Sequence, residues 1–180
     1  LVKSVVVLHG VTGSGKTEIY MNVISNILKQ GKNAIMLVPE ISLTPQMVER
    51  FVSRFGNKVA VMHSGLSMGE RYDQWNKIQK GEVSVVVGAR SAIFAPLENI
   101  GVIIIDEEHD SSYVSESNPR FHTHKVARYL AFIHNCPLVL GSATPNISSY
   151  KKAKDGIYHL VELPERINGL EMPKMEIVDM

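Results

Sequence analysis

The chain has 180 residues, which is enough for one domain with a substantial core. With 44% hydrophobic and 21% charged residues, its composition is that of a soluble globular protein. The formal net charge of +1 gives no overall positive field, although a DNA-binding groove needs charge on one face only. The single cysteine, Cys136, excludes a disulfide framework within the chain and a multi-cysteine zinc site, and it favours a reducing, cytoplasmic setting. No apolar run approaches the length of a membrane span, and no signal-peptide layout is present.

Short apolar runs alternate with amphipathic stretches along nearly the whole chain, which indicates βαβ units and a parallel sheet. The runs are rich in Val, Ile and Leu without polar alternation, as expected for strands covered on both faces. We expect strands at Val5–His9, Ala34–Val38, Val59–His63, Val83–Gly88, Val102–Asp106 and Leu138–Ser142. The fold class is therefore α/β, with helices on both faces of the sheet.

Helix signals fall between these strands. Helices are expected from Lys16 to about Gln30, from Thr44 to about Arg54, from Ser67 to about Lys80, and from His122 to His134. Thr44-Pro45 is an N-cap followed by a first-turn proline, Ser67-Met-Gly-Glu70 is a capping box, and Gly31 suits the position just past a helix. An apolar stripe that includes Leu130 predicts the last helix.

The pattern weakens after Gly156. The segment Leu163–Lys174, with two prolines and one glycine, is expected to be an exit linker. Residues 1–162 would then form one lobe and residues 163–180 would lead out of it. Because the chain opens on a strand at Leu1, and Glu176–Met180 looks like another strand beginning, both ends are expected to be cuts within a larger protein.

Gly10-Val-Thr-Gly-Ser-Gly-Lys-Thr17 matches the full phosphate-loop (P-loop) pattern, between a predicted strand and a predicted helix. Glycines permit a tight loop whose N–H groups surround phosphates, and the following helix directs its positive end at the same anion. We expect Lys16 to reach the β- and γ-phosphates of ATP and the Thr17 hydroxyl to ligate Mg²⁺. The expected nucleotide contacts are Gly10, Val11, Thr12, Gly13, Ser14, Gly15, Lys16, Thr17 and Glu18.

An apolar strand ends in Asp106-Glu107-Glu108-His109. Ligands of open parallel sheets bind beyond the carboxyl ends of the strands, where these side chains emerge. Asp106 is expected to hold Mg²⁺ and Glu107 to orient and deprotonate the attacking water. A coupling role is favoured for His109, whereas Glu108 is open between a solvated acid and a direct role.

Asp106-Glu-x-His109 together with Gly141-Ser-Ala-Thr-Pro145 resembles motifs II and III of superfamily 2 helicases. A closer resemblance, over nearly the whole chain, is to the PriA family of bacterial replication-restart helicases. It is carried by Gly10–Tyr20, Val38–Gln46, His63-Ser64, Gly88–Pro96, Asp106–Tyr113 and Pro119–His122. The resemblance implies a P-loop, RecA-like fold that forms the first of two lobes, with ATP between the lobes and single-stranded DNA across their top.

The resemblance also implies which residues meet DNA and which transmit its binding. The implied DNA-facing residues are Ser42, Ser64, Arg90, Ser91, Arg120 and Phe121. For the hydroxyls of Ser42, Ser64 and Ser91, an N-cap or turn role is an equal alternative. The hydroxyls of Ser142 and Thr144 would link the nucleotide state to the DNA state, or could equally satisfy backbone groups at the end of the strand. Two departures from the usual family form occur around the aromatic-rich loop Tyr113–His122: Ser115–Asn118 is less basic, and Thr123-His-Lys125 replaces Ala-Arg-Asp.

At the level of the parent protein, the resemblance implies a cytoplasmic 3′-to-5′ DNA helicase of replication restart and primosome assembly. Its cofactors would be ATP and Mg²⁺, with zinc in a part of the parent outside this stretch. Its partners would be single-stranded and forked DNA, primosome proteins and single-stranded DNA-binding protein, without a membrane. The piece alone is expected to be a monomer with little activity, because a second lobe supplies the arginine finger. Arg166 lies in the exit linker, where nothing is expected to place it against a γ-phosphate.

Two alternatives stay open. The chain could be a lobe of another superfamily 2 translocase, such as a branch-migration or restriction motor, or a switch that binds nucleotide without hydrolysing it. A P-loop kinase of small molecules is disfavoured, because Asp106–His109 together with Ser142 and Thr144 has no role in that chemistry.

Overall fold

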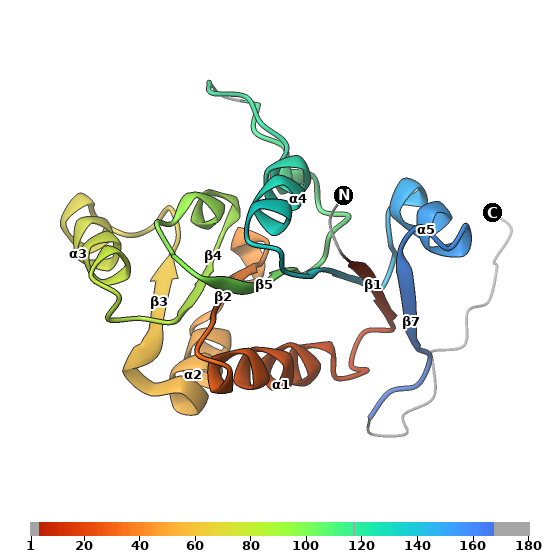
Figure 1. Cartoon of the computed structure of the whole chain (residues 1–180), viewed down its shortest axis with the longest axis horizontal. Coiled ribbons are helices and arrows are strands. Elements are labelled where there is room, and N and C mark those ends of the chain that lie inside the picture. The colour runs from red at the N-terminus through yellow and green to blue at the C-terminus, as the bar shows by residue number, and fades with distance from the viewer. Residues whose placement is uncertain (1–3, 117, 168–180) are drawn as a thin grey trace, which may run out of the picture.

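The computed structural model describes residues 4–116 and 118–167, which form a seven-stranded sheet between two layers of helices (Figure 1). The strand order is β3-β4-β2-β5-β6-β1-β7, and every neighbouring pair runs parallel. The strands are β1 (Val5–Gly10), β2 (Asn33–Leu37), β3 (Val59–Met62), β4 (Val85–Gly88), β5 (Ile100–Ile105), β6 (Leu138–Ser142) and β7 (His159–Leu163). The expected α/β class with a parallel sheet is confirmed.

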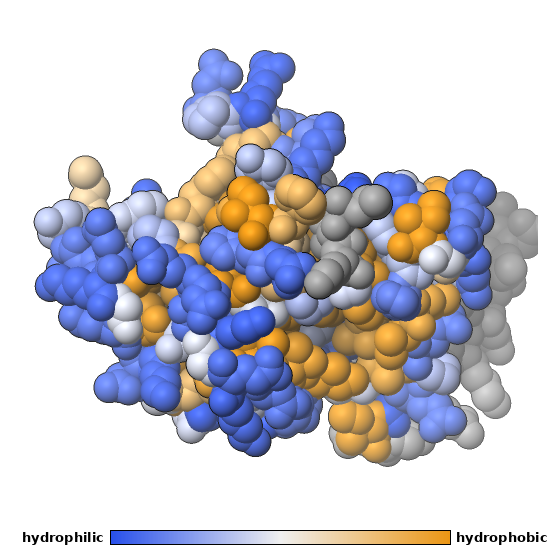
Figure 2. Space-filling view, in the orientation of Figure 1, coloured by the Kyte–Doolittle hydropathy of each residue, from blue (hydrophilic) through white to orange (hydrophobic). Residues whose placement is uncertain are grey.

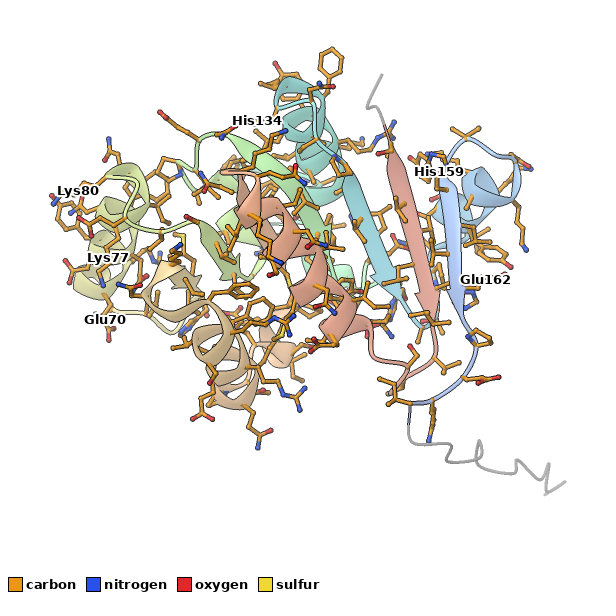
Figure 3. The ribbon with its side chains drawn as sticks, turned by 60° about the horizontal axis from the view of Figure 1, so that its bottom comes forward. Glu70, Lys77, Lys80, His134, His159 and Glu162 are labelled. Carbon is orange, nitrogen blue, oxygen red and sulfur yellow. The ribbon has the colours of Figure 1, made fainter. Side chains whose placement is uncertain are left out.

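Helices cover both faces of this sheet. One face carries α1 (Lys16–Lys29) and α2 (Pro45–Phe55), and the other carries α3 (Met68–Gln79), α4 (Thr123–Ile133) and α5 (Ile147–Lys154) (Figure 1). In Figure 3, Lys77 of α3 and Lys80, which follows the helix, point outward at the end of the molecule far from β7. The helix α3 therefore supports the sheet without contributing to the site described below.

The two faces of the sheet hold two separate cores. Along β2, Ile35 and Leu37 belong to the core under α4 and α5, whereas Ala34 and Met36 belong to the core under α1 and α2. These four side chains are fully buried. Since successive residues of a strand point to opposite faces, a strand covered on both faces must be apolar throughout, which is why these strands lack polar alternation.

The six predicted strands and four predicted helices are all present, with ends within two residues of those expected. The capping signals in the sequence explain this agreement for the helices. Both halves of the capping box at Ser67 and Glu70 form, and Thr44 Oγ1 accepts a hydrogen bond from the Met47 N–H at 3.3 Å. The bonds from Glu70 N and Met47 N each satisfy a first-turn N–H group that has no acceptor within its own helix.

Among the α-helices and strands of the described residues, α5 and β7 were not predicted. The strand β7 pairs with β1 at the edge of the sheet, and His159 and Glu162 lie on it (Figure 3). Leu163, expected to begin the exit linker, is its last residue, and the division into lobe and linker stays a prediction. Residues 168–174 of the predicted linker and the predicted strand Glu176–Met180 lie outside the described residues. Across residues 4–116 and 118–167, no helix is long and apolar enough to span a membrane.

Candidate active site

The P-loop forms a tight turn between β1 and α1. Gly13 and Gly15 have φ angles of +82° and +85°, which residues with a Cβ adopt only with strain. At Gly10 a Cβ would lie 2.6 Å from Ser14 Oγ, so the loop leaves no room for a side chain there. Ser14 Oγ is buried without a hydrogen-bond partner among the described residues. A buried polar atom without a partner, in a glycine-lined cradle at a helix N-terminus, fits an oxygen-rich anion such as a phosphate.

A cavity of about 1240 Å³ opens beside this loop. It is lined by residues that include Thr12, Lys16, Thr17, Arg50, Asp106 and Glu107. Lys16 is 8% exposed, and its Nζ donates a hydrogen bond to Gly10 O at 2.7 Å, so the ammonium group is held within the loop. The structure therefore brings the P-loop and the first two acids after β5 to one cavity, at the carboxyl edge of the sheet.

Two tyrosines hold Asp106. Tyr20 Oη donates to Asp106 Oδ1 at 2.9 Å, and Tyr113 Oη donates to the Asp106 carbonyl at 2.6 Å. Burial raises the pKa of the Asp106 carboxyl, with the nearby Glu107 charge adding to the effect, although the Tyr20 hydrogen bond and Lys16 oppose it. A divalent cation would favour the ionised form, so Asp106 and the neighbouring Thr17 fit the expected Mg²⁺ site.

Sequence reasoning gave Tyr20 no function. The available signal is its position four residues after Lys16 on α1, which places both side chains on one helix face. Tyr20 is 1% exposed and faces the end of β5, where Asp106 follows. Its hydroxyl therefore limits the conformations open to the Asp106 carboxylate.

Glu107 has a left-handed backbone, with φ at +45°. This conformation costs a non-glycine residue on the order of 1–3 kcal/mol and persists only where the surroundings enforce it. Here the flanking N–H groups are bound on both sides: Asp106 N donates to Leu37 O of β2, and Glu108 N donates to Gly141 O of β6, each at 2.9 Å. The backbone is thus held where the Glu107 side chain lines the cavity.

His109 and Ser142, expected to take part in coupling, are in contact. His109 Nδ1 lies 2.7 Å from Ser142 Oγ, and Ser142 Oγ accepts a hydrogen bond from Thr144 N at 2.9 Å. His109 Nδ1 also lies 3.7 Å from Glu107 Oε2. The Ser142 hydroxyl thus satisfies a backbone N–H at the end of the strand, which was the alternative expected for it, and it contacts the histidine as well. Motif II and motif III are physically connected through these atoms.

Glu108 is not a solvated acid, and that reading is wrong. Its side chain is fully buried and accepts hydrogen bonds from Asn146 and Ser149, with His124 Nε2 at 3.3 Å. Burial by itself would raise the pKa of the Glu108 carboxyl, but the adjacent His124 and the hydrogen bonds from Asn146 together lower it below the ordinary value. The group is therefore a carboxylate inside the protein.

The residues expected to face DNA follow β2, β3 and β4 at the same edge of the sheet. Glu40 Oε1 accepts from Ser64 N at 2.8 Å, which joins the segment containing Ser42 to the segment after β3. Arg90 Nη1 donates to the carbonyls of Ser112 and Val114 at 3.1 and 3.0 Å. Arg90 thus holds the segment that follows motif II, and Ser91 beside it is exposed. Contact of these side chains with DNA stays a prediction.

The loop Val114–His122 projects beyond α4 (Figure 1) and its tip is hydrophilic (Figure 2). Its base is closed by a bridge between Val114 and His122 and by the hydrogen bond from Ser115 N to Phe121 O at 2.9 Å. The Phe121 ring packs edge-to-face on Phe94, with centroids 4.9 Å apart, and against the core. Phe121 therefore fixes the loop to the domain, while Arg120 is exposed.

The segment after β7 returns to the P-loop. Val11 N donates to Leu163 O and Ile167 N donates to Gly13 O, both at 3.2 Å. A Cβ on Gly13 would lie 3.9 Å from Cγ of Arg166, and Ile167 lines the cavity. Arg166, expected to lie in an exit linker, is therefore beside Gly13 of the phosphate loop, and its place relative to a γ-phosphate stays a prediction. The missed strand β7 is responsible for its position beside Gly13, because it runs parallel to β1 and ends at the same edge.

The P-loop, the acidic pair and the histidine–serine contact follow one another along the chain and lie together on a parallel RecA-like sheet. This combination defines the nucleotide-binding lobe of a superfamily 2 helicase. Residues 1–153 match the DEAD/DEAH box helicase family. The chain belongs to this family.

Curated relatives give a narrower likeness. The chain is 62% identical over 176 residues to the replication restart protein PriA of Bacillus subtilis and 51% identical over 180 residues to that of Synechocystis. These matches cover 98% and 97% of the chain but 22% of each relative, so the chain spans about a fifth of their length.

Solved structures agree on the fold. The chain superimposes on the Pyrococcus furiosus Hef helicase domain with a TM-score of 0.65 at 23% identity, covering 93% of this chain and 36% of that one. It superimposes on RecG bound to a three-way DNA junction with a TM-score of 0.59 at 25% identity, covering 93% and 21%. A DEAD box protein from Methanococcus jannaschii gives 0.61 at 23% identity, covering 89% and 46%. The RecA-like helicase fold is thus confirmed.

Proposed function

We propose that this chain is the first of two RecA-like lobes of a replication-restart DNA helicase, which couples ATP hydrolysis to 3′-to-5′ translocation on single-stranded DNA. One observation carries the proposal: the cavity that holds Lys16 and Glu107 is joined through His109 to Ser142 of the next motif. A motor needs such a connection between the phosphate site and a segment that responds to the bound DNA strand. The high identity to replication restart relatives supports the biological setting.

Each site residue has a defined task in this proposal. The P-loop N–H groups and Lys16 bind the phosphates, and Glu107 orients the attacking water and accepts its proton. Thr17 and Asp106 would hold Mg²⁺, which neutralises the charge that develops on the phosphate oxygens. Tyr20 keeps the Asp106 carboxylate in place. The second lobe supplies the arginine finger and closes the cavity.

The exposed edge after β2, β3 and β4 would lie along the DNA backbone, with Arg90 and the hydroxyls of Ser42, Ser64 and Ser91 nearby. Contacts of this kind carry little sequence information, which suits a motor that must step along any sequence. The parent protein would work in the bacterial cytoplasm on forked DNA, with primosome proteins and single-stranded DNA-binding protein. Its zinc would be bound outside this lobe.

The test uses the full-length protein that contains this lobe. Glu107→Gln should keep ATP binding, measured by calorimetry, and abolish both DNA-stimulated phosphate release and unwinding of a forked substrate. The matched control is Glu82→Gln, which makes the same chemical change at an exposed position before β4. Normal turnover by Glu107→Gln would overturn its assignment as the base. Preference for branched junctions over forks would instead favour a branch-migration motor.

A further inference from the structure

Glu108 is at the centre of a cluster made by Glu108, His124, Asn146 and Ser149. Its Oε1 accepts from Asn146 N at 2.6 Å. Its Oε2 accepts from Asn146 Nδ2 at 3.0 Å and from Ser149 Oγ at 3.2 Å, and it lies 3.3 Å from His124 Nε2. The Glu108 carbonyl accepts a further bond from Asn146 Nδ2 at 3.2 Å. Both carboxylate oxygens are therefore satisfied, although the side chain is fully buried.

The cluster joins three segments that are distant in sequence. Glu108 directly follows the proposed base, Glu107. His124 lies in the first turn of α4, immediately after the loop Val114–His122, and Asn146 precedes α5, immediately after motif III. Thr123 completes the connection on the α4 side, because its Oγ1 donates to Tyr113 O at 2.7 Å. A single carboxylate thus touches the ends of the two segments expected to sense DNA and nucleotide.

The energetics favour a role beyond stability. Moving a carboxylate out of water costs several kcal/mol, and well-packed apolar residues of similar volume are often as stable as a buried ion pair. A buried ionic cluster does, however, define one geometry, because its partners must sit at hydrogen-bonding positions. That geometry matters here because the adjacent Glu107 has a left-handed backbone, which only surrounding contacts can hold.

We propose that Glu108 is a positioning residue: it fixes the backbone that directs Glu107 into the cavity, and it links that backbone to the DNA-sensing loop through His124 and to motif III through Asn146. This inference rests on the proposed function, since it takes Glu107 as the base and the loop Val114–His122 as the sensor. A shift of the loop moves the start of α4, and His124 transmits the shift to Glu108. DNA binding would thereby change the orientation of the Glu107 side chain in the cavity.

The experiment compares four variants of the full-length protein: Glu108→Gln, His124→Phe, His124→Arg and His134→Phe. Arginine can donate to the Glu108 carboxylate and is the conservative replacement for His124. His134, at the other end of α4 (Figure 3), is the matched control. The measurements are kcat and KM for ATP, with and without saturating single-stranded DNA, and the thermal unfolding temperature.

Glu108→Gln should lower DNA-stimulated kcat by about tenfold or more while KM for ATP stays the same. His124→Phe should lower DNA stimulation by a similar factor, whereas His124→Arg and His134→Phe should stay within about twofold of the wild type. The double variant Glu108→Gln/His124→Phe should lose no more than the worse single variant, because both substitutions interrupt one connection.

Three results would overturn the inference: full DNA stimulation in Glu108→Gln, additive losses in the double variant, or failure of His124→Arg to recover stimulation. If Glu108→Gln does not fold, the comparison of His124→Phe with His124→Arg decides the question alone. A wild-type protein whose ATPase does not respond to DNA would refute the proposed function instead. The DNA response of the wild-type ATPase is measured before any variant is compared. Failure of the proposed function and failure of this inference are therefore distinguishable.

Discussion

Gly141→Ala tests whether β6, Tyr20 and Asp106 fit together as the structure shows. A Cβ at position 141 would lie 1.7 Å from Tyr20 Oη and 2.8 Å from Tyr20 Cζ. Ordinary contact between such atoms requires about 3.5 Å, so the hydroxyl would have to retreat by roughly 2 Å. Tyr20 is 1% exposed and lies in the core under α1, which leaves no open space for that movement. The hydrogen bond to Asp106 would break.

The magnitude follows from two contributions. Overpacking a filled core costs about 1–3 kcal/mol, and losing a hydrogen bond to a charged group costs about 1.5–3 kcal/mol. We therefore expect Gly141→Ala to lower the free energy of unfolding by about 3–5 kcal/mol. Tyr20→Phe alone removes the hydrogen bond without the clash and should cost about 1.5–3 kcal/mol.

The assay is urea unfolding of the 180-residue chain, followed by circular dichroism. In the Gly141→Ala background, Tyr20→Phe should cost nothing further or restore some stability, because the hydrogen bond is already lost and the clashing oxygen is gone. Gly69→Ala is the control: a Cβ there meets no atom within 4 Å, and alanine favours the helix α3. Additive losses from Gly141→Ala and Tyr20→Phe would refute the reasoning, as would a neutral Gly141→Ala.

Three further predictions concern the site. Lys16→Ala should abolish ATP–Mg²⁺ binding in calorimetry, because it removes the ammonium group that is held within the phosphate loop; retained affinity would contradict this. Arg120→Ala should weaken DNA stimulation of the full-length ATPase and leave its thermal unfolding unchanged, whereas Phe121→Ala should also destabilise the protein by about 2 kcal/mol through lost packing on Phe94. Equal unfolding temperatures for these two variants would contradict the loop-anchoring role. The 180-residue chain alone should fold, bind nucleotide weakly and release little phosphate with DNA, and robust turnover would refute the half-site interpretation.

The sequence by itself determined the parts of this protein that depend on local chemistry. The P-loop, the strand ending in Asp106 and Glu107, and the capping box at Ser67 are contiguous patterns. Their conformations follow from glycine, capping side chains and apolar runs within a few residues. For this reason the α/β class and the sheet edge that carries the P-loop and Asp106 could be predicted with nearly correct bounds.

The tertiary structure alone decided which distant groups meet. Glu108 stands between Glu107 and His109 in a polar run, and nothing in that run distinguishes a buried residue from an exposed one. Its burial depends on Asn146, which is 38 residues away. The strand β7 pairs with β1 although none of its own residues is buried. Hydrogen-bond pairing and burial are properties of the assembled sheet, so they became visible only when β1, β6 and β7 lay side by side.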